Sequence, residues 1–361
     1  MNKPSALNPP VRVGIIGMGV GAAVQIPAFQ SIPGIIIAGL ADGGSGSAQK
    51  IADNIVPRPK VFKCAEDLIA DKNIDLISLA VPPACQHKLA EIAINNVKHI
   101  ICEKPFGHDA KKALALAEKA KLKGIQNIVS YQFRYEAGVR ALANILAEGK
   151  IGEIRGISVN WHTSGGRNPN KIWTWRDSKK SSTGVLGEFC SHVFDYASLL
   201  LGAPIVEIDC KETQTIKTRP DDNGDEKPLE TSDSCEIICR FANGCTGQFS
   251  VSNAALATTG HKIEIHGSKG VGIFHHNPPF YNRDAIVRVV TPDSDCLLPL
   301  NIAGNTLELE SDSRIRAFAL LTADFISGRA MGQADFFHAT DVLKVIAAAI
   351  KSVKTGRAVV V

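Results

Sequence analysis

The sequence predicts an α/β fold in two parts, a doubly wound parallel sheet followed by an α+β domain. In the first 131 residues short apolar runs alternate with helical patterns, as in a series of βαβ units. Beyond residue 131 strand-like runs follow one another, joined by hairpin signals such as 242–244, and helices return later. A chain of 361 residues also exceeds one typical core. We therefore expect a disordered tail over 1–10, a first domain over 11–131 and a second domain over 132–361.

The first domain is organised around the stretch Val11–Phe29, which reads as strand, glycine turn and helix. Gly17 allows a tight turn, and Gly19 lets the backbone approach a ligand. The small Ala22 lets the helix pack closely on the strand, and the helix N-terminus would face a pyrophosphate. This order predicts a dinucleotide site, while a glycine-rich turn in an ordinary α/β unit is the alternative.

The second strand, 35–40, ends just before Asp42, which lies 20 residues beyond Ala22. An acid at this distance is expected to bind the ribose hydroxyls of the cofactor and to repel a 2′-phosphate. Asp42 therefore favours NAD over NADP. Its small neighbours, residues 43–45, leave NADP possible.

Further strands and helices continue the first domain. Strands are expected at 61–63, 75–81, 98–102 and 126–131, and helices at 47–54, from about 66, at 86–95 and from the Asp109 cap to 123. Because ligands bind at the carboxyl ends of parallel strands, residues at these ends are cofactor candidates. The candidates are Gly17, Gly19, Val20, Asp42, Val81, Pro82, Glu103 and Lys104.

Lys104 is the first candidate for acid–base chemistry. An unperturbed lysine has a pKa near ~10.4, so proton transfer at neutral pH requires a lower value. Burial and a nearby positive nicotinamide ring would both lower it. The alternative is a structural charge pair between Lys104 and Glu103.

The second domain has a different order of helices and strands. A helix is expected at 137–148, a helix near 186–201, and two further helices at 314–327 and 339–353; strands are expected at 154–161, 205–217, 235–241, 246–252, 262–266, 270–274 and 285–290. The polar segment 220–228 is expected to be a mobile loop.

The helix near 186–201 carries Glu188, His192 and Asp195. Spacings of four and three place them on one helical face, and an imidazole between carboxylates can pass a proton near neutral pH. A satisfied structural histidine is the alternative. A second group, Trp161-His162 and Trp173–Arg176, includes all three tryptophans of the chain and suits a sugar-like substrate, although core packing explains it nearly as well.

Composition excludes several function classes. A net charge of +4 with interspersed signs shows no nucleic-acid footprint, and no stretch is long and apolar enough to span a membrane. The polar, proline-rich start is not a signal peptide, and nine cysteines without a CxxC pair fit reduced thiols in a cytoplasmic enzyme. No metal site is predicted, because His275-His276, the nearest candidate, is expected to lie in a Pro-rich loop without a visible partner.

These motifs resemble the Gfo/Idh/MocA family of glucose–fructose oxidoreductase and inositol dehydrogenase from about residue 11 to 361. The matching motifs are Glu103-Lys104-Pro105, Phe133-Arg134-Tyr135, Trp175-Arg176, Gly184, the helix start from Glu188 to His192, and Asp341 with Thr355-Gly356-Arg357. The resemblance implies a Rossmann domain and a substrate-binding domain with an open, largely antiparallel sheet that mediates homodimers or homotetramers.

The resemblance further implies NAD(P)-dependent hydride transfer to or from a secondary alcohol or ketone of a sugar, inositol or related polyol. Lys104, Glu188 and His192 take the catalytic roles; the substrate-binding candidates are Arg134, His162, Trp175, Arg176 and Asp195. Glu188 replaces a common Asp and Cys190 a common Gly, which calls orthodox inositol dehydrogenase activity into question. An NAD-retaining glycosidase and a non-catalytic NAD- and sugar-binding regulator are the alternative functions on this scaffold.

Overall fold

The computed structural model describes residues 7–276, 285–298, 312–329, 332 and 334–361. The chain divides into two compact units, Met1–Tyr135 with Arg314–Thr340, and Glu136–Ser313 with Asp341–Val361. Residues Arg314–Thr340, which lie late in the sequence, therefore belong to the first unit.

The first unit holds a six-stranded parallel sheet in the order β3-β2-β1-β4-β5-β6. Its strands are β1 (Val11–Ile16), β2 (Ile35–Ala41), β3 (Lys60–Phe62), β4 (Leu76–Leu79), β5 (His99–Cys102) and β6 (Asn127–Val129). The strand order reverses between β1 and β4, which in doubly wound sheets creates a ligand-binding crevice at the carboxyl ends. The predicted fold class of this part is confirmed.

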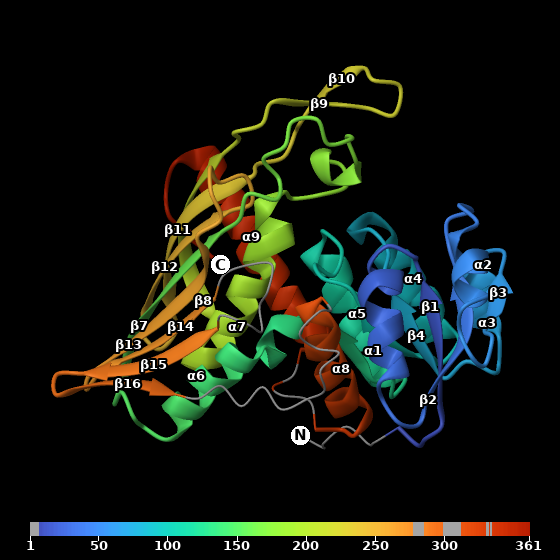
Figure 1. Cartoon of the computed structure of the whole chain (residues 1–361), viewed down its shortest axis with the longest axis horizontal. Helices are drawn as coiled ribbons and strands as arrows, with labels where there is room; N and C mark the ends of the chain where they lie inside the picture. Colours follow the sequence, from blue (N-terminus) through green and yellow to red (C-terminus); the bar gives the residue numbers. More distant parts are fainter. Residues whose placement is uncertain (1–6, 277–284, 299–311, 330–331, 333) are drawn as a thin grey trace. The chain divides into compact units, whose positions relative to one another are not determined.

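Helices connect these strands (Figure 1). They are a π-helical turn (Gly21–Gln25) continuing into α1 (Ile26–Gln30), α2 (Ser47–Ala52), α3 (Ala65–Ala70), α4 (Pro83–Asn95) and α5 (Ala110–Leu122). A 3₁₀ turn (Gln132–Tyr135) follows β6, and α8 (Ser313–Ile326) belongs to this unit from Arg314. The Asp109 carboxylate accepts hydrogen bonds from the Lys111 and Lys112 backbone N–H groups and caps α5 as predicted. Pro83 begins α4, where a missing N–H costs nothing.

The second unit is built on a nine-stranded sheet in the order β16-β15-β14-β13-β7-β12-β11-β8-β17. The strands are β7 (Ile154–His162), β8 (Ile205–Thr213), β11 (Ser234–Phe241), β12 (Thr246–Ser252), β13 (Gly260–Gly267), β14 (Val271–His276), β15 (Ile286–Thr291), β16 (Ser294–Leu298) and β17 (Val359–Val360). β7 and β12 pair in parallel, and the other neighbouring pairs are antiparallel. The expected open, largely antiparallel sheet is confirmed.

Helices of this unit lie along one face of the sheet (Figure 1). They are α6 (Ala137–Ala147), a π-helical turn (Leu186–Cys190) that continues into α7 (Ser191–Leu201), and α9 (Phe336–Thr355), of which the part from Asp341 belongs here. The strands alternate buried and exposed residues, as β11 does, so that one face forms the core with these helices. Among the described residues, no helix is both long and apolar enough to cross a membrane.

Two expectations for this unit were wrong. Segment 220–228 is not a loop throughout, because its ends lie in a hairpin in which β9 (Thr218–Pro220) pairs with β10 (Glu226–Pro228), and only residues 221–225 form the connecting turn. The Asp221 carboxylate accepts hydrogen bonds from the backbone of Asn223 and Asp225 and organises the turn. His275-His276 likewise ends strand β14, where His276 is the register partner of His261 on β13.

Candidate functional site

The glycine turn after β1 has the geometry that a dinucleotide phosphate requires. Gly17 has a φ of +97°, and a Cβ on it would lie 2.3 Å from the Ala80 carbonyl oxygen. Gly19 is exposed, and a Cβ there would meet no described atom within 4 Å. The first glycine is therefore needed by the fold, whereas the second leaves open space for a ligand to approach the backbone. This chain's turn fits the cofactor.

The helix after this turn begins with a π-helical turn rather than the regular α-helix that was expected. The Ile26 N–H donates to the Gly21 carbonyl, five residues back. The wider turn lies where Gln25 is fully buried. The Gln25 amide accepts a hydrogen bond of 2.8 Å from the Ser78 hydroxyl and donates one of 2.9 Å to the Glu103 carboxylate. The sequence analysis did not predict these buried hydrogen bonds. The one signal for them was a glutamine within the otherwise apolar start of a helix.

Glu103 and Lys104 follow β5 at the carboxyl edge of the sheet. Glu103 is 8% exposed, and burial raises the pKa of its carboxyl although the charge of Lys104 and the hydrogen bond from Gln25 act in the opposite direction. Lys104 is half-buried. Glu103 is thus held from β4 and the first helix, and it fixes the backbone that presents Lys104.

The Asp42 carboxylate follows β2 and is held by its own loop. It accepts hydrogen bonds of 2.8 Å from the backbone N–H groups of Gly44 and Ala48, and one of 3.1 Å from the Ser45 hydroxyl. The Ala48 N–H contributes most to lowering the pKa of Asp42. The carboxylate is therefore charged and oriented before any ribose arrives.

The other predicted cofactor contacts lie on the same edge of the sheet. Val20 follows the glycine turn, and Val81 and Pro82 follow β4; all three are half-buried. The Val81 Cγ1 atom would lie 3.2 Å from a Cβ on Gly17, so the β1 and β4 ends meet here. The structure thus brings the candidates from β1, β4 and β5 to one edge, with Asp42 at the end of β2.

Arg134, a substrate-binding candidate, lies in the 3₁₀ turn after β6. It is 2% exposed, and its guanidinium lies 2.8 Å from the His338 ring nitrogen. The Tyr131 and His338 rings meet edge to face with centroids 5.8 Å apart. Within this unit Arg134 serves packing, and its substrate role stays a prediction.

In the second unit, Glu188, Arg176 and Trp175 come together. Glu188 lies in the π-helical turn, 3.3 Å from the Arg176 guanidinium. That guanidinium lies over the Trp175 ring, 4.4 Å from its centroid. The 3₁₀ turn Trp175–Asp177 has a capping box in which Thr174 and Asp177 exchange hydrogen bonds.

A buried ion pair anchors this turn to the β9–β10 hairpin. The Arg219 guanidinium lies 3.0 Å from the Asp177 carboxylate, with side chains 13% and 6% exposed. The Trp173 indole N–H donates to the Pro228 carbonyl at 3.2 Å. Sequence reasoning assigned neither residue of the ion pair a role, because the hairpin itself was not expected.

His192 and Asp195 lie on α7 and are buried, at 2% and 0% exposed, whereas Glu188 is half-buried. The His192 and Trp161 ring centroids are 6.4 Å apart. The prediction of one shared face assumed a continuous α-helix, but the π-helical turn at Leu186–Cys190 changes the angular offset of Glu188.

His162 ends β7 and takes part in a strand-to-strand chain. Its Nε2 atom lies 2.8 Å from the Ser250 hydroxyl, which donates at 2.6 Å to the Glu236 carboxylate. These hydrogen bonds link the end of β7 to β12 and β11.

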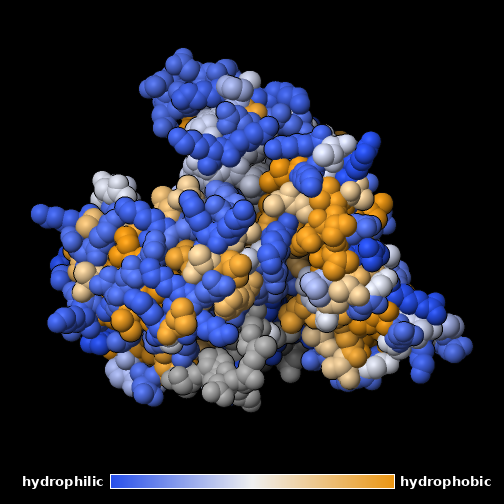
Figure 2. Space-filling view, turned by 180° about the vertical axis from the view of Figure 1, so that it is seen from behind, coloured by the Kyte–Doolittle hydropathy of each residue, from blue (hydrophilic) through white to orange (hydrophobic). Residues whose placement is uncertain are grey.

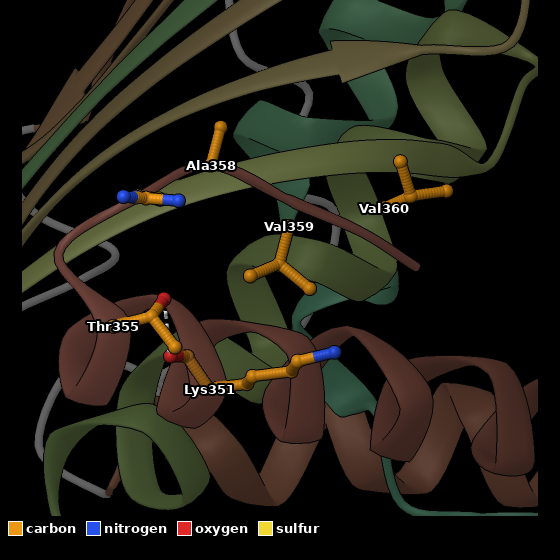
Figure 3. Close-up of a pocket in the computed structure, with 6 residues that line it drawn as sticks. Lys351, Thr355, Ala358, Val359 and Val360 are labelled. Carbon is orange, nitrogen blue, oxygen red and sulfur yellow. Dashed lines mark hydrogen bonds between the residues drawn. The ribbon is translucent and has the colours of Figure 1, made fainter.

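A surface hollow of about 600 Å³ lies at the end of α9 and is drawn in Figure 3. It is lined by Lys351, Thr355, Arg357, Ala358, Val359 and Val360. The Thr355 hydroxyl donates to the Lys351 carbonyl at 3.0 Å. None of the predicted site residues lines this hollow, so it carries no part of the proposed chemistry.

Comparison with known proteins identifies both units. The model of the oxidoreductase family, NAD-binding Rossmann fold (GFO_IDH_MocA), matches residues 11–131, and that of its C-terminal alpha/beta domain matches residues 143–361. An uncharacterized oxidoreductase of Synechocystis is 30% identical over 73% of this chain and 71% of its own length. The inositol 2-dehydrogenase of Rhizobium meliloti is 27% identical over 72% and 74%.

The levoglucosan dehydrogenase of Pseudarthrobacter phenanthrenivorans is 26% identical over 58% of this chain and 57% of its own length. A solved structure titled levoglucosan dehydrogenase, complex with NADH and L-sorbose, superposes with a TM-score of 0.85 at 22% identity, covering 97% of this chain and 98% of the other. The fold is shared throughout. Together with both domain models, these matches show that the chain belongs to the Gfo/Idh/MocA family of NAD-binding oxidoreductases.

Proposed function

We propose that this protein transfers a hydride between NAD and a secondary alcohol or ketone carbon of a sugar, an inositol or a related polyol. The observation that carries the proposal is Lys104 at the end of β5, next to a Glu103 that is buried and held by Gln25. The inositol and levoglucosan dehydrogenases among the relatives support a carbohydrate-like substrate.

The first unit would hold the cofactor. The open backbone at Gly19 and the helix start at Gly21 would receive the pyrophosphate, and the charged Asp42 carboxylate would accept hydrogen bonds from the ribose hydroxyls. NAD, when bound, supplies the nicotinamide carbon that accepts or gives the hydride. Asp42 would also repel a 2′-phosphate, which favours NAD over NADP.

Lys104 would bind the reacting oxygen and hold the hydroxyl proton at its Nζ atom. In oxidation of an alcohol the proton leaves the hydroxyl as the carbonyl forms; in reduction the same group returns it. Because Glu103 is fixed by hydrogen bonds, the lysine backbone has little freedom to turn away. This preorganisation lowers the cost of aligning the proton donor.

Glu188, His192 and Arg176 would place the substrate from the second unit. The Arg176 guanidinium holds Glu188 and stacks on Trp175, so a carboxylate, a cation and an aromatic face are presented together. Such a set matches a polyhydroxylated ring, with hydrogen bonds to hydroxyl groups and apolar contact with ring carbons. His192 would stabilise the reacting oxygen, and Asp195 would orient the part of α7 that carries His192. Arg134 and His162 would make the remaining contacts with the substrate.

Absorbance of reduced nicotinamide, recorded with NAD or NADP and a panel of inositols, hexoses and sugar acids, tests the proposal. With the best substrate we expect Lys104→Ala and His192→Ala each to lower kcat by about 10²–10⁴-fold. Lys119→Ala, at an exposed ion pair of α5, is the matched control and should leave kcat unchanged. Intact turnover in both site variants would overturn the assigned roles.

The panel also separates the alternatives. An NAD-retaining glycosidase would release sugar from a glycoside without net reduced cofactor, and a regulator would bind cofactor and sugar without turnover. The assay is therefore run in the oxidative and the reductive direction, and with glycosides, before the proposed dehydrogenase activity is rejected.

We further propose a homo-oligomer, a dimer or tetramer, formed through the second unit. Figure 2 shows hydrophobic side chains gathered on the surface of this unit. Exposed examples from its strands are Ile238, Ile286, Leu297 and Val360. Light scattering after size exclusion should show a smaller particle for Ile238→Lys, whereas Leu122→Lys on α5 of the first unit should leave the mass unchanged.

A further inference from the structure

A buried cluster of metal-ligand type lies in the second unit and shares no residue with the Glu188–Arg176–Trp175 group. Glu136 is the N-cap residue of α6, His261 lies on β13 and His276 ends β14. One ligand atom from each residue lies within 4.8 Å of the other two. All three residues are buried: both histidines are 0% exposed and Glu136 is 9% exposed.

The pairing register of β13 and β14 brings the two histidines together. His261 and His276 are opposite each other in the antiparallel β13–β14 pair, which places their side chains on the same face. The Glu136 carboxylate reaches that face and lies 3.2 Å from His276 Nε2. Glu136 makes no side-chain cap to its own helix, and among the described residues its Oε2 atom has no hydrogen-bond partner.

We propose that Glu136, His261 and His276 bind a divalent transition-metal ion, with zinc as the ion to test. Two imidazoles and a carboxylate are a ligand set for Zn²⁺ and for Fe²⁺ or Mn²⁺. The buried carboxylate would gain a cation as its partner, which compensates its desolvation. None of the three ligands is among the residues assigned to the proposed dehydrogenase activity.

The chemistry of His261 suits a ligand. Its side chain is 0% exposed, and one of its ring nitrogens already has a hydrogen-bonding partner. Its Nε2 atom lies 2.9 Å from the Tyr196 hydroxyl, so Nδ1 is the nitrogen that would face the metal. Metal-binding histidines commonly donate their other ring N–H to such an outer partner, which orients the ring.

Neighbouring rings would shield the centre from water. The Trp161 ring stacks on His261 with centroids 4.4 Å apart, and the Phe274 ring lies edge-on at 5.9 Å. Metal bonds of about 2.1 Å at tetrahedral angles separate ligand atoms by about 3.4 Å. The Glu136 and His276 atoms, 3.2 Å apart, are already near this spacing. Because the three ligand atoms lie within 4.8 Å of one another, His261 would have to approach by at most about 1.4 Å.

Metal content and thermal stability test the proposal on the full-length protein. After expression with added Zn²⁺ and dialysis, we expect close to one zinc per chain by mass spectrometry of the metal, and a Tm that falls after chelation and returns when Zn²⁺ alone is restored. Glu136→Gln and His276→Gln should each weaken Zn²⁺ binding by at least about 100-fold, more than the loss of an outer partner would. His275→Gln, on the neighbouring strand residue, is the matched control and should keep the metal.

Near-ultraviolet circular dichroism of Glu136→Gln shows whether that variant is folded, so that a lost metal is not confused with a lost fold. A folded Glu136→Gln protein without the zinc that the control retains supports the site. Metal-free wild type with no Tm response to Zn²⁺ overturns it and leaves a Glu136–His276 ion pair. Zinc bound equally by all variants also overturns it, because the metal then lies elsewhere.

Discussion

The side-chain amide of Gln25 donates a 2.9 Å hydrogen bond to the buried carboxylate of Glu103, and so joins the glycine-turn helix to the strand end that presents Lys104. The same amide accepts from Ser78 on β4. Three segments of the NAD-binding unit are therefore tied through one glutamine.

Gln25→Met should destabilise the protein, because it keeps the volume but leaves the Glu103 carboxylate without this donor. An unsatisfied buried group costs about 1–3 kcal/mol. Urea denaturation would measure the loss in the free energy of unfolding. Gln49→Met, at an exposed amide of α2, is the control and should change little; equal effects of the two variants would contradict a special role for Gln25.

Glu103 should give the protein a measurable pH dependence. Burial raises the pKa of its carboxyl above the ordinary 4.5. The folded state therefore holds this proton more tightly than the unfolded state, and stability decreases as pH rises from about 4.5 through the folded pKa. Relative to Glu103→Gln, wild type should lose at most about 1.4 kcal/mol per pH unit over that interval. Denaturation curves recorded from pH 4 to 8 measure this difference in the free energy of unfolding. A difference that stays constant with pH would show that the pKa of the Glu103 carboxyl is not raised.

Asp42→Ser should shift the preference from NAD towards NADP, since it removes a carboxylate that is held charged at the end of β2. Repulsion of about 1.4 kcal/mol corresponds to about tenfold in the ratio of kcat/KM values for the two cofactors. Asp42→Asn separates charge from hydrogen bonding, because it keeps one acceptor oxygen. If neither variant changes the ratio, Asp42 does not select the cofactor.

Arg219→Met should cost about 3 kcal/mol in the free energy of unfolding, because Asp177 would keep a buried charge without its cation. The double variant with Asp177→Asn should recover part of this loss. The exposed pair Arg240–Glu207 provides the comparison, and Arg240→Met should cost less than about 1 kcal/mol. Chemical denaturation distinguishes these values, and similar costs at both pairs would refute the argument from burial.

Local signals predicted most of the fold. The apolar run that becomes β4, the Asp109 cap of α5 and the glycine turn at Gly17 each depend on neighbours in sequence, so their physical causes are visible in the chain itself. The β9–β10 hairpin was missed because its three-residue strands are polar and bordered by prolines. Its stability comes from contacts such as Asp177–Arg219, which no local pattern shows.

The site was predicted only as far as residue types and strand ends allow. Lys104 and Asp42 could be placed at the carboxyl edge, because parallel strands share that edge. The Gln25–Glu103 bond could not be anticipated, since the two residues are 78 positions apart. His276 was similarly judged to lack partners, because His261 and Glu136 meet it only through the register of a sheet and the end of a helix.

The π-helical turn Leu186–Cys190 has a consequence for sequence change in this family. A π turn accommodates one residue more than an α turn, so an inserted residue is absorbed within the turn while the helix on either side keeps its own packing. Deleting one residue here would let a regular helix form through α7 and would rotate Glu188 about the helix axis relative to the still-buried His192. If Glu188 contacts the substrate as proposed, such a deletion would change substrate preference while the buried residues of α7 keep their packing.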